Sequence, residues 1–162
     1  MNESNNIVNM VIRPARLEDA QVIADYNNGI AEETEDKSLD MTTLLAGVKQ
    51  ILSRSELGRY YVAVVGEGDD EEVIGQLMIT FEWSDWRNGL FWWIQSVYVH
   101  SEYRRQGVFR ALYEHVREEA KGEAGVCGLR LYVEHENKRA QNSYVNMGMK
   151  GAGYEIFEED WS

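Results

Sequence analysis

The chain has 162 residues, of which 44% are hydrophobic and 27% charged, enough for one domain that buries a core without disulfides. Its single cysteine, Cys127, excludes an internal disulfide, and a formal net charge of −12 argues against a nucleic-acid partner, because phosphate binding depends on basic surface. No apolar run suits a signal peptide or a membrane span. We therefore expect a cytoplasmic protein with no membrane partner and one domain over residues 1–162, in which residues 1–9 form a flexible terminus.

The first third of the chain predicts a short strand followed by two helices. The strand covers residues 10–13 and is closed by Pro14, the only proline. Apolar residues at helical spacing then predict a helix from Leu17 to about Asn28, followed by a polar, acidic loop over residues 29–39. Asp40 is a suitable N-cap for a second helix.

The rest of the chain predicts a sheet with two further helices. Alternating and apolar runs indicate strands at residues 60–65, 73–81, 90–99 and 129–133, with end strands within 151–161. Helices are expected after residue 107 and over 137–147, the latter closed by Gly148. Because a helix connects strand 90–99 to strand 129–133, these two strands should run parallel. The predicted fold class is α/β, with a mixed, mostly antiparallel twisted sheet flanked by helices.

Residues 97–111 predict an anion site between a buried strand and a helix. A helix N-terminus presents unpaired N–H groups and partial positive charge, and Gly107 allows a ligand to approach the backbone closely. Arg104, Arg105 and Arg110 surround this turn. The alternative is an ordinary strand-to-helix turn with a solvated basic edge. If the turn holds an anion, the acidic part of the chain is left to face a cation, since residues 1–103 carry a net charge of −11 and residues 104–162 one of −1. The alternative is that these acidic runs are solvated surface.

Two motifs together resemble the GNAT superfamily of acyl-CoA-dependent N-acetyltransferases. The first is the sequence Arg-Arg-Gln-Gly-Val-Phe at residues 104–109, which follows the strand end Val-Tyr-Val at residues 97–99 after four residues. The second places Asn137, Ala140, Tyr144 and Gly148 at the family's spacing. The resemblance extends over nearly the whole chain, and it departs from the family at Phe109, where the family prefers Gly or Ala.

The resemblance implies acetyl-CoA as the acyl donor and a parallel central strand pair splayed where it binds. The backbone of residues 97–99 would pair with the pantetheine arm, residues 104–110 would wrap the pyrophosphate, and Tyr144 would stand at the sulfur. The implied cofactor-binding residues are Val97, Tyr98, Val99, Arg104, Arg105, Gln106, Gly107, Val108, Phe109, Arg110 and Asn137. For Tyr144, the alternative is a helix tyrosine that packs on the sheet.

Acetyl transfer to an amine also requires a proton acceptor and a binding site for the amine. Candidate bases are Glu82, at the exit of a strand, Glu33 and Glu35, in the acidic loop, and Asp85. Gln95 stands where some relatives keep a glutamate and could position a water. Candidate acceptor-binding residues are Glu33, Glu35, Trp83 and Asp85. Each of these acids could equally be a solvated surface group. His100 and His135 have no ligand-spaced partner, so no metal is expected.

The sequence therefore predicts an acetyl-CoA-dependent N-acetyltransferase that acts on the primary amine of a small, cationic acceptor by direct attack in a ternary complex. A peptide or protein N-terminus is the alternative acceptor. An alternative of another class is a non-catalytic acyl-CoA-binding sensor. A homodimer through the apolar end strands is compatible with the sequence.

Overall fold

The computed structural model describes residue 7 and residues 9–162, so most of the predicted flexible terminus, residues 1–6 and 8, lies outside the described part. The chain divides into two compact units, one ending at Leu131 and one running from Tyr132 to Ser162. The prediction of one domain over residues 1–162 stays a prediction. The described part contains no helix long and apolar enough to cross a bilayer.

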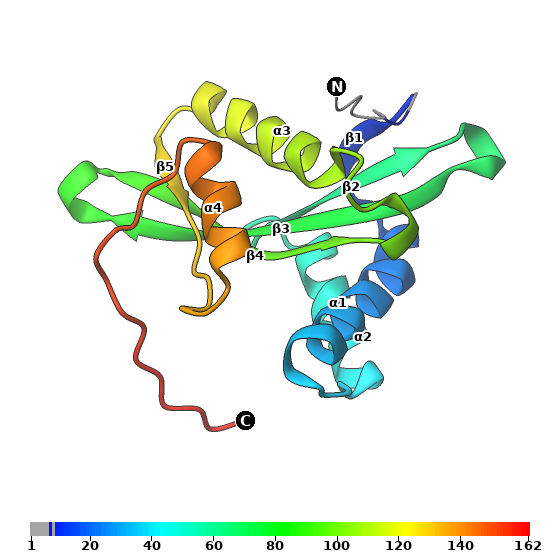
Figure 1. Ribbon diagram of the computed structural model, residues 1–162, viewed down its shortest axis with the longest axis horizontal. Coiled ribbons are helices and arrows are strands. Elements are labelled where there is room, and N and C mark those ends of the chain that lie inside the picture. Colours follow the sequence, from blue (N-terminus) through cyan, green and yellow to red (C-terminus); the bar gives the residue numbers. More distant parts are fainter. Residues whose placement is uncertain (1–6, 8) are drawn as a thin grey trace. The chain divides into compact units, whose positions relative to one another are not determined.

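Five strands form one mixed sheet in the order β1-β2-β3-β4-β5 (Figure 1). They are β1 (Val11–Pro14), β2 (Arg59–Val65), β3 (Glu72–Ser84), β4 (Gly89–Val99) and β5 (Val126–Arg130). Neighbours are antiparallel up to β4, and β5 runs parallel to β4, as the crossover predicted. The fold class is therefore confirmed, with the parallel pair at one edge of this sheet.

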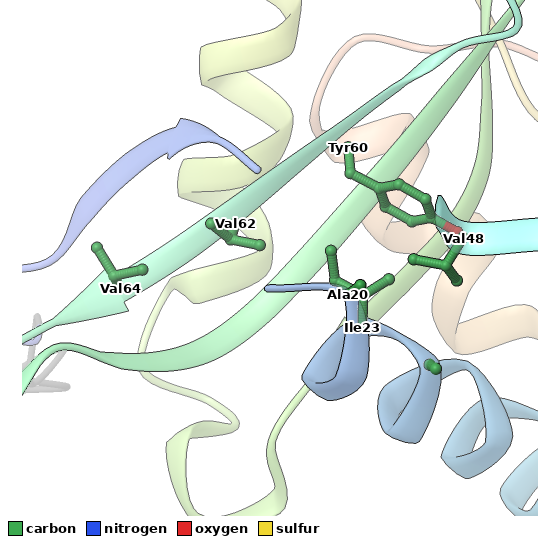
Figure 2. Packing of buried hydrophobic residues seen from close by; sticks show 7 residues of the cluster. Ala20, Ile23, Val48, Tyr60, Val62 and Val64 are labelled. Carbon is green, nitrogen blue, oxygen red and sulfur yellow. The ribbon is translucent and has the colours of Figure 1, made fainter. Parts of the chain in front are cut away.

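Two helices, α1 (Ala20–Glu35) and α2 (Met41–Ser53), cover one face of the sheet. Asp40 caps α2, accepting the Thr43 N–H at 2.9 Å, as its position before the apolar run predicted. The core under these helices joins Ile23 and Val48 to Tyr60, Val62 and Val64 of β2 (Figure 2). Burial of each large aliphatic side chain there contributes about 1.5–3 kcal/mol.

The helix α3 (Val108–Gly122) covers the opposite face (Figure 1). Its inner side chains Leu112 and Val116 are fully buried, and so is Trp92 of β4. Tyr61 of β2 donates its hydroxyl to Glu119 of α3 at 2.6 Å. Alternate side chains of β2 therefore pack against the helices on opposite faces of the sheet. A shift of the strand by one residue would exchange the two sets, so this packing fixes its register.

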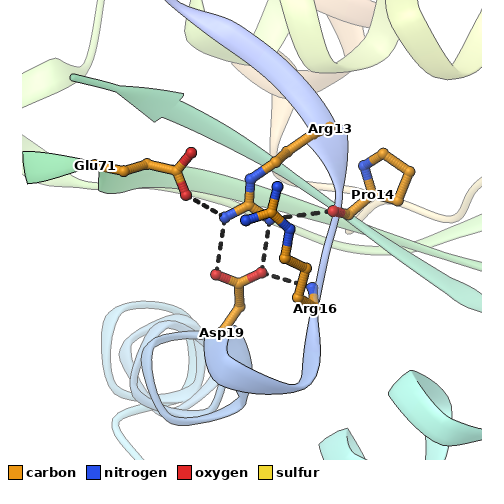
Figure 3. Close-up of polar contacts among 5 residues, drawn as sticks. All are labelled: Arg13, Pro14, Arg16, Asp19 and Glu71. Atoms are coloured by element: carbon orange, nitrogen blue, oxygen red, sulfur yellow. Dashed lines mark hydrogen bonds and ion pairs between the residues drawn. The ribbon is translucent and has the colours of Figure 1, made fainter. Parts of the chain in front are cut away.

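A polar network joins β1 to the start of α1 (Figure 3). Arg13 donates to Asp19 at 2.8 and 3.1 Å and to Glu71 at 2.6 Å, and the backbone N–H of Arg16 donates to Asp19 at 2.6 Å. Burial disfavours the charge of Asp19, but the bonds from Arg13 and Arg16 outweigh it and lower the pKa of this carboxyl. The network holds the first turn of the α1 segment against the sheet.

Three predicted boundaries were wrong. The first helix does not end at Asn28 but continues to Glu35, because Gly29 is not a helix stop: a Cβ there would lie 3.2 Å from the ring of Tyr98, so the glycine allows α1 to pack closely on β4. β5 begins at Val126 and ends at Arg130, before the predicted 129–133 segment is complete. Residues 151–161 contain no strand, and their apolar side chains are exposed.

Candidate active site

The end of β4 has an open backbone edge. Its pairing with β5 covers only Leu90 to Trp93, although β4 continues to Val99. The N–H of His100 donates to Ile74 of β3 at 2.9 Å, and alternation along a strand therefore turns the backbone groups of Val97 and Val99 toward the edge away from β3. β5 ends at Arg130, which pairs with Trp93, and the edge of β4 beyond that pair can bind an extended ligand as a further strand would.

A β-bulge lies next to the open edge. Met78 of β3 pairs with Ser96 and Ile79 pairs with Ile94, so Gln95 is the extra residue of β4. The Gln95 side chain is exposed and donates to Thr80 at 2.8 Å. The apolar pattern of residues 90–99 carried no signal of this bulge, which bends the strand where it leaves β5.

The turn before α3 starts the helix at a left-handed glycine, and the anion site expected there stays a prediction. Gly107 is the N-cap and has a φ of 82°, and Arg105 is also left-handed, with a φ of 63°. The first backbone bond of the helix joins the N–H of Ala111 to the oxygen of Gly107 at 2.9 Å. The N–H groups that precede Ala111 in this turn are therefore not used by the helix ladder and point toward its N-terminal end.

Phe109, the bulky residue of the first motif, lies in the first turn of α3, and its ring packs along that helix. The ring of Phe109 lies 6.3 Å, centroid to centroid, from that of Tyr113, one turn further along α3. Tyr113 is itself buried. Packing of Phe109 along α3 is compatible with a ligand at the glycine turn.

Arg104 and Glu33 form an ion pair. Arg104 Nη2 lies 2.8 and 2.9 Å from the two carboxylate oxygens of Glu33, and this contact lowers the pKa of the carboxyl. Glu33 was expected in a loop that faces the acceptor, but it lies on α1. Two further side chains of residues 104–110 have local partners: Arg110 bonds Glu114 at 2.9 Å, and Gln106 donates to the Glu102 carbonyl at 2.8 Å.

Glu82, the candidate base, belongs to a cluster on the sheet face opposite α3. Trp93 donates its indole N–H to Glu82 at 2.8 Å, and Arg130 of β5 pairs with the other carboxylate oxygen. The Arg130 guanidinium also stacks 3.8 Å from the ring centroid of Phe91. Arg130 was not among the predicted site residues, although an isolated cation within an apolar strand could have pointed to it.

The remaining acceptor candidates lie near the surface. Trp83 is 60% exposed, and Asp85 accepts the N–H of Trp86 at 2.9 Å in the turn that follows β3. Glu35 pairs with Lys37 at 2.7 Å. The structure thus brings Glu33 to Arg104 and Glu82 to Arg130, whereas the contacts of Glu35 and Asp85 within the described part of the chain are with neighbours close in sequence.

The second motif lies in the unit from Tyr132 to Ser162. Asn137 is the N-cap of α4 (Lys138–Asn146), where its side-chain oxygen accepts the Ala140 N–H at 3.1 Å. Gly148 follows the helix with a φ of 96°, as predicted for a C-terminal glycine. Tyr144 is half-buried, and burial raises the pKa of its phenol. Its hydroxyl therefore stays protonated at neutral pH.

Known proteins are similar to this chain in sequence and in fold. The family model described as the acetyltransferase (GNAT) family matches residues 25–149. Thialysine N-epsilon-acetyltransferase from Bos taurus is 35% identical over 83 residues, 51% of this chain and 48% of the relative, so the chain matches about half of its length. A crystal structure of a possible acetyltransferase from Clostridium difficile 630 is 43% identical with a TM-score of 0.86, covering 93% of this chain and 97% of that one. An aminoglycoside N-acetyltransferase in complex with CoA shares the fold, with a TM-score of 0.69 at 16% identity over 94% of this chain and 95% of that one.

Proposed function

This chain belongs to the acetyltransferase (GNAT) family, and we propose that it transfers an acetyl group from acetyl-CoA to the primary amine of a small, cationic acceptor. The observation that carries the proposal is the open edge of β4 at Val97 and Val99, which leads directly into the glycine turn of α3. An extended arm along a strand and a phosphate at a helix N-terminus are the two parts of CoA that such an arrangement suits. The bovine relative, which is named for acetylation of an amino-acid amine, supports an amine acceptor.

The cofactor would bind in one continuous path. The pantetheine arm pairs with the edge of β4, and the backbone N–H groups of the α3 turn, together with Arg105, bind the pyrophosphate. Asn137 contributes a hydrogen bond from its amide group. The N–H of Val97 is the candidate donor to the carbonyl oxygen of the acetyl group as negative charge develops on it.

The reaction requires a neutral amine and a protonated leaving group. At pH 7, deprotonation of an alkyl amine with a pKa of ~10.4 costs roughly 4.6 kcal/mol, so a base or a water chain that ends in one accelerates attack. Glu82 and a water held by Gln95 are the candidates. Because Arg130 and Trp93 both bond Glu82, proton transfer to it requires a rearrangement of that cluster or an intervening water. Tyr144 would donate a hydrogen bond, and then a proton, to the departing thiolate.

A thiol-release assay with acetyl-CoA and a panel of amines tests the proposal. The panel pairs lysine with cadaverine and ornithine with putrescine, so that members of a pair differ only in a carboxylate, and it includes a short peptide with a free N-terminus. We expect turnover with at least one small amine. Measured acetyl-CoA binding without turnover of any amine would contradict it, and turnover of the peptide alone would favour the peptide acceptor.

The engagement of Glu82 by Arg130, together with Gln95 at the bulge, favours a second candidate, a non-catalytic acyl-CoA-binding sensor. Calorimetry with CoA and a comparison of Tyr144→Phe turnover separate the two. CoA binding with no rate that depends on Tyr144 would favour the sensor.

A further inference from the structure

Glu33 and Arg104, which were predicted to bind different ligands, form an ion pair with each other. Glu33, an expected acceptor ligand, and Arg104, an expected phosphate ligand, are joined by the contacts of 2.8 and 2.9 Å from Arg104 Nη2. The Nε–H of Arg104 donates to the Val99 carbonyl at 2.9 Å. The Tyr98 hydroxyl donates to Glu33 at 3.2 Å, and the Arg104 guanidinium lies 5.3 Å from the Tyr98 ring centroid. One cluster thus joins α1, the end of β4 and the start of the turn.

These contacts show which N–H groups of Arg104 already have protein partners. Its Nε–H is used by the last carbonyl of the open edge and one of its terminal nitrogens by Glu33. A phosphate that took the place of the Glu33 carboxylate on Nη2 would have to displace it. Arg105, which follows with a left-handed backbone and an exposed side chain, has no such commitment among the described contacts.

We propose that Glu33 and Arg104 act as one positioning pair that fixes the end of β4 and the start of the cofactor turn against α1, and that neither residue binds a ligand directly. This inference rests on the proposed function. By holding the Val99 carbonyl, Arg104 fixes the position of the backbone along which pantetheine would bind. Glu33 links the pair to the end of α1, from which residues 36–40 lead to α2. An exposed ion pair adds little to stability by itself, so its effect is expected in the placement of the turn.

A charge exchange tests the pair. The variants are Glu33→Arg, Arg104→Glu and the double exchange, compared by kcat/KM for acetyl-CoA, KM for the amine and CoA affinity from calorimetry. Each single variant should lower kcat/KM for acetyl-CoA by about tenfold through misplacement of the turn. The double exchange should return it to within about threefold of the wild type with kcat restored, because the pair is re-formed with opposite charges.

Two results of the double exchange would overturn the inference. A loss of CoA affinity equal to or greater than that of Arg104→Glu alone would make Arg104 a phosphate ligand. A recovered CoA affinity with a raised KM for the amine would make Glu33 an acceptor ligand. A recovery of both parameters is the expected result.

The pair Arg54–Glu56 is the matched control. It is also an exposed arginine–glutamate contact at 2.8 Å, and it lies after α2. Its exchange should leave every kinetic parameter unchanged. If the wild type neither binds CoA nor transfers acetyl groups, the proposed function fails. If the wild type does both but the double exchange does not recover kcat/KM for acetyl-CoA, the pair alone is refuted.

Discussion

Glu82 of β3 and Arg130 of β5 pair across β4, where Trp93 lies between them and donates to the same carboxylate. The three side chains come from three adjacent strands, and Trp93 and Arg130 form the last residue pair between β4 and β5. The carboxylate is 40% exposed and the guanidinium 25%. A candidate base is thus held in place by a cation where the pairing of β4 with β5 ends.

Loss of the Arg130 cation should weaken the fold modestly. Arg130→Met leaves Glu82 with only the Trp93 bond, and because the pair is partly exposed we expect a loss of about 1 kcal/mol in the free energy of unfolding. Urea denaturation measures it. The control is the double variant Arg130→Met with Glu82→Gln, which should recover part of the loss; a double variant that is less stable than Arg130→Met would contradict the pairing.

Removal of the Tyr144 hydroxyl should slow turnover with little effect on cofactor binding. We expect Tyr144→Phe to lower kcat by roughly 10²-fold, the lower range for loss of a general acid. Because burial raises the pKa of Tyr144, its phenol should stay protonated throughout the working range. The wild-type pH–rate profile should therefore show no loss from this group below about pH 10. A Phe variant with wild-type kcat would exclude this role.

Gly107→Ala should damage the cofactor turn. A φ of 82° places this residue in the left-handed region, where a Cβ costs about 1–2 kcal/mol. The variant should lose stability by that amount and bind CoA more weakly. Gly47→Ala is the matched control: an added Cβ on α2 meets nothing within 4 Å, so it should stabilise the protein by up to about 1 kcal/mol through helix propensity. Equal effects of the two substitutions would contradict the assigned conformation of Gly107.

The Arg13–Asp19 network should make stability sensitive to acid. The pKa of Asp19 is lower in the folded state than its unfolded value, so the stabilisation is fully present above about pH 4 and is lost as the pH falls through the folded pKa. At pH 7, Asp19→Asn should cost about 1–3 kcal/mol, since it removes charged hydrogen bonds. Urea titrations at pH 7 and pH 3 should show the difference between wild type and variant shrinking in acid. A difference that grows in acid would contradict the assignment.

Local chemistry made much of the fold predictable. Asp40 and Gly148 marked helix ends because capping depends on one side chain or one backbone conformation, and alternation from Tyr60 onward marked the hairpin. Gly29 misled the prediction because a glycine that allows close packing on Tyr98 looks, in sequence, like a helix terminator. The apolar residues after Gly151 looked like strands, although a strand also requires a partner edge.

For the site, the sequence by itself determined the parts that depend on short-range order: the strand, the glycine turn and the helix that starts after it. These are neighbours along the chain, so their spacing is readable as a motif. Only the tertiary structure decided that Glu33 belongs to Arg104 and Glu82 to Arg130, and that β4 is bulged at Gln95. The residues of those pairs are 71 and 48 positions apart, and a carboxylate's partner at such a distance is chosen by strand register and helix packing, which no local pattern contains.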